Sequence, residues 1–342
     1  MELPTMADAL RARRLLAHHL PPTPMWSYPA LNATAGARVL VKHENVQPTG
    51  AFKVRGGISL LAGMTPAERS GGVLGYSTGN HAQSLAYAAA LHDTPCAIVM
   101  PRNPSPGKAK AVRDLGAELI EFGENFDQAR GHAENLARQR GMRLVSAANE
   151  PAIIAGVATA YLEIFGQEPD LDTVIVPVGG GSGAAAACLV AASLAPRCEI
   201  IAVQSAASPA AHDSWHAGRP VDRPNRSVVG GLATGSGFAL TQQILRAHLA
   251  DFLLVSDAMI AAAQWVLMRD AHTLAEGAGA AAVAALLGCP QRFAGRTVAV
   301  ICTGGNANEA EIRASLPSLS AEDTLTESQR PDGLAIPAFS RR

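Results

Sequence analysis

Short apolar runs rich in β-branched residues alternate along the chain with longer segments of helical periodicity. The apolar runs predict strands at residues 39–43, 73–76, 97–100, 118–122, 173–178, 200–204, 252–255 and 297–301. The longer segments predict helices at residues 54–62, 81–91, 107–115, 127–138, 152–165, 184–194, 258–269 and 278–287. Strands that alternate with helices of this length indicate an α/β protein with open parallel sheets, each covered by helices in a three-layer arrangement.

The order of these elements predicts two domains and a tail. The strands between residues 73 and 122 form a regular β-α-β-α-β unit, and the later strands supply a second sheet. We therefore expect a smaller domain over about residues 40–150, inserted in a larger, cofactor-binding domain of residues 1–39 and 151–318. The chain turns polar afterwards, so we expect residues 319–342 to form a C-terminal tail outside both cores.

Composition supports a two-domain globular protein and argues against several classes of partner. The chain has 342 residues, which at ~150 residues per domain corresponds to two domains. Its formal net charge is −1 and no run of Lys or Arg is visible, so nucleic acid is not expected as a partner. The five cysteines show no CxxC spacing, which argues against a disulfide framework and a thiolate zinc site.

The apolar segments also bear on location. No uncharged apolar run reaches the ~18 residues of a membrane span, so no membrane partner is expected. The N-terminal segment carries arginines among its leucines and lacks the apolar stretch of a secretory signal. These features favour a cytoplasmic enzyme.

A glycine-rich loop follows the strand predicted at residues 173–178. Four of the five residues from Gly179 to Gly183 are glycine, and a helix is predicted directly after them. A strand, a glycine loop and a helix N-terminus together bind phosphate, because free backbone N–H groups and the helix dipole point at the anion. The alternative is a tight turn without a ligand. Gln204 stands where a dinucleotide site needs an acidic residue, so a small phosphate monoester fits better.

Two further segments carry candidate chemistry. Lys53 lies between Phe52 and Val54 at the start of a predicted helix, where loss of water would lower its pKa and favour amine chemistry. The alternative is a lysine whose stem covers apolar surface while its amine stays in water. The segment Ser77–His81 follows a strand and opens a helix, which predicts a second anion site, with Ser77 or Thr78 as the helix cap.

Five short motifs stand out along the chain. They are Gly50-Ala-Phe-Lys-Val-Arg-Gly56, Ser77-Thr-Gly-Asn-His-Ala-Gln83, Gly179–Gly183, Ala275-Glu-Gly-Ala-Gly-Ala280 and Thr303-Gly-Gly-Asn306. In this order they resemble the pyridoxal-phosphate-dependent serine/threonine dehydratase family, whose members have the tryptophan-synthase-β fold (fold type II). The resemblance spans residues 20–315, the whole predicted core.

The resemblance implies pyridoxal 5′-phosphate as cofactor and a role for each matching residue. Lys53 falls on the lysine that binds the cofactor aldehyde covalently, and Phe52 falls on the ring beside it. Asn80 falls on the residue that binds the cofactor 3-hydroxyl, and Thr303 on the hydroxyl that faces the pyridine nitrogen. The residues that fall on the phosphate cup are Gly179, Gly180, Gly181, Ser182 and Gly183. Those that fall on the substrate-carboxylate loop are Ser77, Thr78, Gly79, Asn80 and His81.

The resemblance also implies the reaction. The expected activity is elimination of water from a 3-hydroxy amino acid, L-threonine or L-serine first, to give a 2-oxo acid and ammonia. One alternative is an amino-acid racemase, in which Thr78 would act as the second acid/base. Another is a dehydratase of phenylserine or of a hydroxyectoine-derived compound. A nucleotide-binding module is the non-enzymatic alternative. Family precedent suggests a homodimer or homotetramer.

The chain departs from the family pattern at several positions. Ala51 replaces a usual serine, and Gly230-Gly231 occupies the place where an acidic residue usually precedes glycine. Tyr76 replaces a small residue, which leads us to expect a reshaped pocket.

We expect no bound metal. Gln204 stands where some family members carry an acidic cation ligand, so too few hard oxygen ligands remain there. His212 and His216 have the i, i+4 spacing of a metal pair on a helix, but no third ligand is evident.

Overall fold

The larger of two sheets has six strands. The computed structural model describes residues 2–317. Only the edge strand β1 runs antiparallel to its neighbour, and the other pairs in this sheet are parallel. The order across the sheet is β1 (Met25–Ser27), β2 (Arg38–His43), β10 (Thr297–Cys302), β7 (Thr173–Pro177), β8 (Glu199–Ser205) and β9 (Asp251–Val255).

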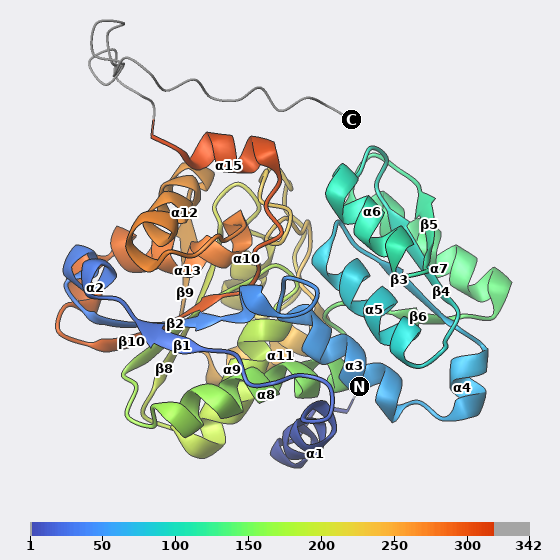
Figure 1. Ribbon diagram of the computed structural model, residues 1–342, viewed down its shortest axis with the longest axis horizontal. Coiled ribbons are helices and arrows are strands. Elements are labelled where there is room, and N and C mark those ends of the chain that lie inside the picture. Colours follow the sequence, from blue (N-terminus) through green and yellow to red (C-terminus); the bar gives the residue numbers. More distant parts are fainter. Residues whose placement is uncertain (1, 318–342) are drawn as a thin grey trace, which may run out of the picture.

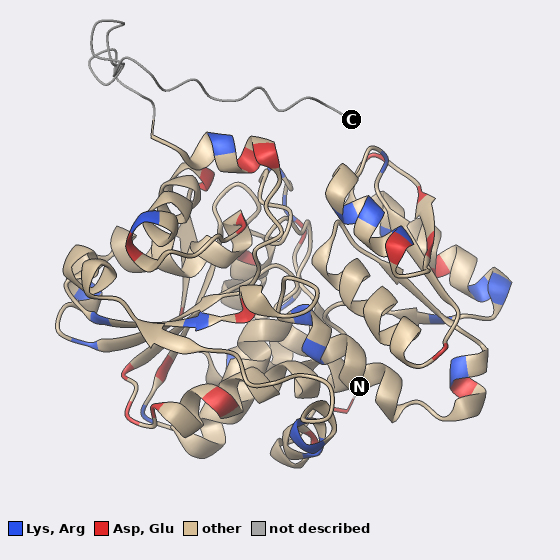
Figure 2. Ribbon diagram, viewed as in Figure 1, with Lys and Arg blue, Asp and Glu red and all other residues tan. Residues whose placement is uncertain are grey.

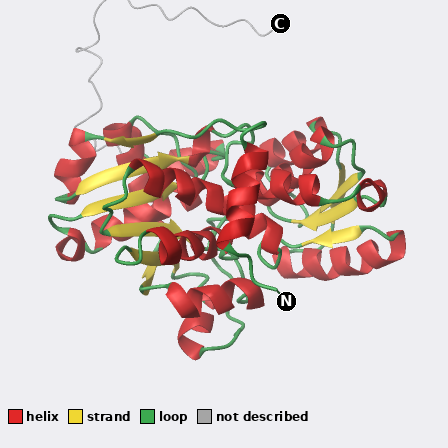
Figure 3. Ribbon diagram, turned by 90° about the horizontal axis from the view of Figure 1, so that it is seen from below, coloured by secondary structure: helices red, strands yellow, loops and turns green. Residues whose placement is uncertain are grey.

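The smaller sheet has four strands, all parallel. Its order is β5 (Glu118–Glu121), β4 (Cys96–Met100), β3 (Val73–Tyr76) and β6 (Arg143–Val145). The two sheets form the centres of two helix-covered units that lie side by side (Figures 1 and 3). The predicted α/β class with two parallel sheets is thus confirmed.

Helices cover both faces of the larger sheet. Alternate residues of β7 point to opposite faces, and each belongs to a different apolar core. This explains why the strand is apolar throughout. The core on one face includes α1 (Met6–Leu16), α8 (Pro151–Gln167), α9 (Ser182–Leu194) and α11 (Ala239–His248). The core on the other includes α2 (Pro29–Ala35), α12 (Asp257–Ala271) and α13 (Gly277–Gly288).

The smaller sheet is covered in the same way. On one face lie α5 (Asn80–Leu91) and α6 (Pro106–Asp114), and α3 (Lys53–Gly63) continues this core toward the larger unit. On the other face lies α7 (Phe126–Arg140). The remaining short elements are η1 (Glu44–Val46), α4 (Pro66–Ser70), α10 (Ala210–Ala217), α14 (Pro290–Phe293) and α15 (Glu309–Ser315).

The predicted domain boundary at residue 40 needs one correction. β2 pairs with β1 and β10, so residues 40–43 belong to the larger sheet. Local sequence could not show this, because a buried apolar strand has the same pattern in either sheet. The rest of the division stays a prediction, and the predicted tail at residues 319–342 lies outside the described residues.

Charged residues of both signs are intermixed over the two units (Figure 2). Among the helices of residues 2–317, none combines the length and the apolar character that a bilayer crossing requires.

A buried ion network fixes the start of α3. The Arg55 guanidinium lies 2.8 Å from Glu44 Oε2 and 2.7 Å from Glu163 Oε1. Lys42 Nζ lies 2.6 Å from Glu163 Oε2, so two cations face two carboxylates. The side chains of Arg55 and Glu44 are 2% and 0% exposed. The network therefore joins β2, α3 and α8 just behind Lys53.

Candidate active site

All residues that the sequence singled out for the site surround one cavity between the two sheet units. Three strands end there: β3 leads into Ser77, β7 into the glycine loop and β10 into Thr303. Carboxyl ends of parallel strands are the usual location of ligand sites in open α/β sheets. The empty space of the cavity, together with the open solvent at its mouth, is about 820 Å³. The predicted residues that line it are Phe52, Lys53, Ser77, Thr78, Gly79, Asn80, His81, Gly179, Gly180, Gly181, Ser182, Gly183 and Thr303.

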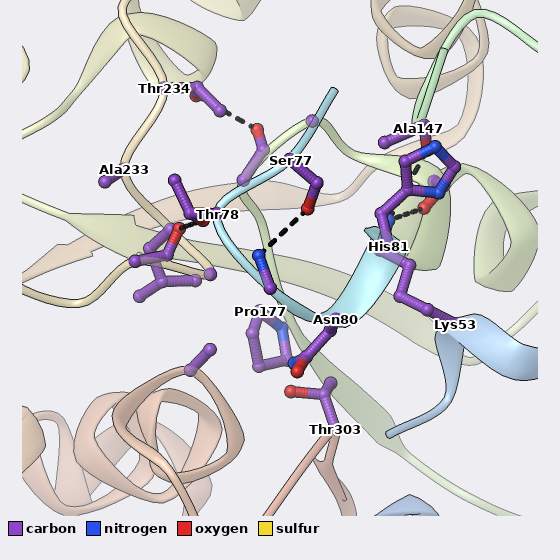
Figure 4. A pocket seen from close by; sticks show the side chains of 18 of the residues that line it. Lys53, Ser77, Thr78, Asn80, His81, Ala147, Pro177, Ala233, Thr234 and Thr303 are labelled. Carbon is purple, nitrogen blue, oxygen red and sulfur yellow. Dashed lines mark hydrogen bonds between the residues drawn. The ribbon is translucent and has the colours of Figure 1, made fainter. Parts of the chain in front are cut away.

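Lys53 is the first residue of α3, and its amine points into the cavity (Figure 4). Its Nζ donates hydrogen bonds to Ser182 Oγ at 2.7 Å and to Ala147 O at 3.4 Å. Burial lowers the pKa of Lys53 from 10.5 to about 8, as the apolar neighbours in the sequence predicted. The Phe52 ring centroid lies 5.0 Å from Nζ. The amine therefore has a substantial neutral fraction near pH 8.

The glycine loop presents free backbone donors to the cavity. Gly181 is the N-cap of α9 with φ of 93°, a conformation that favours glycine. Within residues 2–317, the N–H groups of residues 180–183 have no protein acceptor. A Cβ at Gly179 would lie 2.3 Å from Gly231 O, so crowding against the chain also requires glycine. The loop thus forms a cradle with unpaired N–H groups at a helix N-terminus, as a phosphate requires.

Thr234 and Thr241 hold this cradle from behind. Thr234 Oγ1 donates to Gly179 O at 3.3 Å, and Thr241 Oγ1 donates to Gly180 O at 2.8 Å. With the carbonyl oxygens bound on the far side, the N–H groups of the loop are left for a ligand.

The segment Ser77–His81 forms a tight turn at the start of α5. The N-cap is Gly79, not Ser77 or Thr78 as predicted, and no side chain caps the helix. Instead, Ser77 Oγ accepts from Gly79 N at 3.1 Å, and Thr78 Oγ1 donates to Gly230 O at 3.4 Å. Both hydroxyls therefore shape the turn and line the cavity.

His81 lies under this turn and is buried. Its Nε2 has no hydrogen-bond partner in the described chain. Burial, followed by the charge of Lys53, lowers the pKa of His81 to about 3. The imidazole is therefore neutral at physiological pH.

Asn80 and Thr303 both line the cavity, and their side chains lie next to each other in the view of Figure 4. The Asn80 side chain donates to Glu276 Oε1 and accepts from Asn306 Nδ2, the latter at 2.9 Å. Thr303 O accepts from Phe52 N at 3.0 Å, which ties the end of β10 to the residue before Lys53.

Several lining residues were missed by the sequence analysis. Lys108 lies on an amphipathic, charged helix, so its pattern is that of an exposed lysine; Phe126, Leu232 and Phe238 looked like ordinary core residues. Glu276, which lies behind the lining residue Asn80, belongs to a motif that the resemblance included, but no role had been given to it. The tertiary fold alone brings these residues to the site.

Two residues that depart from the family pattern, Tyr76 and Gln204, make contacts within the fold rather than lining the cavity. Tyr76 is buried against Phe126, with ring centroids 5.4 Å apart, and does not line the cavity. Tyr76 therefore does not line the pocket itself, because its side chain points to the face of the smaller sheet that α7 covers, and it reaches the pocket only through Phe126. Gln204 Oε1 accepts from the N–H groups of Ala211 and His212, both at 3.1 Å, and so caps α10. Within residues 2–317, no three His, Cys, Asp or Glu side chains gather in a metal-binding group.

Comparison with known proteins assigns the chain to a family. The family model described as "Pyridoxal-phosphate dependent enzyme" matches residues 16–304. The chain belongs to this pyridoxal-phosphate-dependent enzyme family. It is 34% identical over 309 residues to the β-hydroxyaspartate dehydratase of Paracoccus denitrificans, covering 90% of this chain and 98% of the relative. It is also 34% identical to the L-threonine ammonia-lyase of Thermotoga maritima, covering 88% of this chain and 75% of that relative.

Solved structures agree with this assignment. The structure of maize serine racemase aligns with a TM-score of 0.85 and 26% identity, covering 92% of this chain and 97% of the racemase. The crystal structure of T.th. threonine deaminase aligns with a TM-score of 0.83 and 32% identity, covering 89% of this chain and 99% of the deaminase. The protein is thus a lyase that uses pyridoxal phosphate to dehydrate a hydroxy amino acid. The non-enzymatic nucleotide-binding alternative is thereby excluded.

The residues of the cavity fit this cofactor. The glycine cradle offers unpaired N–H groups for the phosphate ester, and Lys53 offers a partly deprotonated amine for the aldehyde. Asn80 and Thr303, which also line the cavity, would supply polar groups for the ring. Bound there, the cofactor would serve as an electron sink for the substrate carbanion.

Proposed function

We propose that this enzyme is an ammonia-lyase that removes water from L-threonine or L-serine, yielding a 2-oxo acid and ammonia. One observation carries the choice of substrate. Apart from Lys53, the only Lys or Arg that lines the cavity within residues 2–317 is Lys108, which lies 3.2 Å from the Glu276 carboxylate. No unpaired cation remains for a second substrate carboxylate, whereas Phe126 and Phe238 offer apolar walls.

Some residues of the site bind the substrate, and another transfers a proton. The hydroxyls of Ser77 and Thr78, with the N–H groups at the start of α5, hold the substrate carboxylate. When its amine is not bonded to the cofactor, Lys53 Nζ would be free to remove the proton from the substrate Cα. A pKa of about 8 makes this amine a suitable base near neutral pH.

A second candidate substrate is 3-hydroxyaspartate. The similarity to the β-hydroxyaspartate dehydratase supports it, since that relative is covered almost completely. In this case Lys108 would leave its ion pair with Glu276 and bind the second carboxylate of the substrate instead.

Release of 2-oxo acid and ammonia distinguishes these candidates. The panel consists of L-threonine, L-serine, L-threo-3-hydroxyaspartate, phenylserine and hydroxyectoine-derived 3-hydroxy amino acids. Our proposal expects kcat/KM for L-threonine or L-serine to exceed that for hydroxyaspartate by about tenfold or more, since an unpaired carboxylate is costly to desolvate. The opposite order, together with a selective loss of hydroxyaspartate turnover in Lys108→Met, would establish the second candidate. Lys110→Met, an exposed lysine of the same helix, is the matched control.

Racemisation is the remaining alternative reaction. The likeness to maize serine racemase and the place of the Thr78 hydroxyl in the cavity support it. Chiral analysis of recovered L-serine tests it, because a racemase returns D-serine at a rate that falls in Thr78→Ala. Cytoplasmic location and homo-oligomeric assembly stay predictions.

A further inference from the structure

A chain of polar contacts lies directly behind Asn80. Glu276 is the N-cap residue of α13, is 3% exposed and does not itself line the cavity. Its Oε1 accepts a hydrogen bond from Asn80 Nδ2, and its Oε2 lies 3.2 Å from Lys108 Nζ. Asn306 Nδ2 donates to Asn80 Oδ1 at 2.9 Å. The Asn80 amide is thus held from both sides by residues of the larger sheet unit.

These contacts determine which way the amide faces. A carboxylate can only accept, so the NH₂ group of Asn80 must face Glu276. The amide donor of Asn306 satisfies the Asn80 oxygen at the same time. One N–H of Asn80 then remains for an acceptor in the cavity. With the amide turned over, Asn80 would set its oxygen against the Glu276 carboxylate and its NH₂ against the donor of Asn306.

The surrounding backbone is built to admit this contact. A Cβ at Gly304 would lie 2.5 Å from Glu276 Oε1 and 3.2 Å from Asn80 Nδ2, so only glycine leaves room. The Glu276 N–H donates to Gly304 O at 3.0 Å, which secures the carboxylate beside the end of β10. The Lys108 side chain is 18% exposed and supplies the opposing charge.

We propose that Glu276 is a positioning residue that orients Asn80 as a hydrogen-bond donor to the cofactor ring, with Lys108 as its counter-charge. This role goes beyond the proposed substrate, because it holds for whichever hydroxy amino acid the enzyme dehydrates. A glutamine side chain at this position could not replace the carboxylate fully, since an amide that accepts from Asn80 must turn its own NH₂ toward the donor of Lys108.

Binding of pyridoxal phosphate to apoprotein, with no amino acid present, tests the proposal. Glu276→Gln should raise the Kd for pyridoxal phosphate by about tenfold or more and change the pH dependence of its visible absorption band. Glu309→Gln removes an exposed carboxylate paired with Arg313 and should leave both quantities unchanged. Should Glu276→Gln not fold, Glu276→Asp is the second variant. It retains the negative charge, but its side chain is shorter and reaches Asn80 less well, so it should also raise the Kd for pyridoxal phosphate.

A double-mutant cycle separates positioning from mere stabilisation. In an Asn80→Ala background, adding Glu276→Gln should change the Kd less than about twofold, since the residue that Glu276 orients is already gone. An undiminished effect in that background would overturn the proposal. So would a Glu276→Gln protein whose apoprotein melts earlier while its Kd stays at the wild-type value.

Discussion

Lys53 Nζ lies 2.7 Å from Ser182 Oγ, although 129 residues separate the two along the chain. Lys53 begins α3 and Ser182 begins α9, directly after the glycine cradle. The hydrogen bond therefore places the amine beside the unpaired N–H groups of the glycine cradle. A cofactor that carries both an aldehyde and a phosphate ester can engage the two together.

Removing the amine should abolish covalent cofactor binding. We expect Lys53→Ala to lose the visible absorption band of the bound cofactor and to lower 2-oxo acid release by about 10³-fold or more, because no other amine of the cavity takes the place of Lys53. Lys110→Ala, which breaks an exposed ion pair with Asp114, should behave as wild type. Recovery of cofactor-labelled peptide from Lys53→Ala after borohydride reduction would contradict this assignment.

The lowered pKa of Lys53 predicts how apoprotein stability depends on pH. The folded pKa is about 8 and the unfolded pKa is near 10.5, so between these values the unfolded chain binds more protons. The free energy of unfolding should therefore rise with pH across this window, by roughly 2–3 kcal/mol at most. Denaturant unfolding of wild type and Lys53→Met at pH 7.5 to 10 measures the difference. A difference that stays constant over this range would show that Lys53 keeps an ordinary pKa.

The buried ion network predicts a large loss of stability on losing its central cation. Arg55→Met should lower the free energy of unfolding by about 3–5 kcal/mol, because the fully buried Glu44 would lose its guanidinium. Arg11→Ala, which breaks an exposed pair with Asp8, should cost about 0.5 kcal/mol or less. Similar losses in the two variants would mean that water reaches Glu44.

The crowding at the glycine cradle predicts that its first residue cannot be enlarged. Gly179→Ala should lower the free energy of unfolding by about 1–3 kcal/mol and weaken cofactor binding, since the new Cβ would lie 2.3 Å from Gly231 O. Gly166→Ala is the matched control: it lies in α8 with open space around it and should stabilise the chain by about 0.5–1 kcal/mol. If Gly179→Ala kept the wild-type cofactor affinity and stability, the backbone around Gly179 and Gly231 would have to shift at little energetic cost.

The sequence predicted the main strands and helices because their periodicities arise within a few neighbouring residues. It overlooked β1 and β6, which have three residues each and are too short for an apolar alternation to stand out. It also assigned residues 40–43 of β2 to the wrong unit, since pairing in a sheet depends on distant strands.

The sequence by itself determined the chemistry at the strand ends: the amine of Lys53, the glycine cradle, and the polar groups of Asn80 and Thr303. Each of these belongs to a short segment whose turn residues and apolar neighbours dictate its local shape. Only the tertiary structure decided that Tyr76 faces away from the cavity and that Glu276 lies behind Asn80, 196 residues distant. Such contacts depend on how the two sheets are placed against each other, and no local pattern of residues encodes that placement.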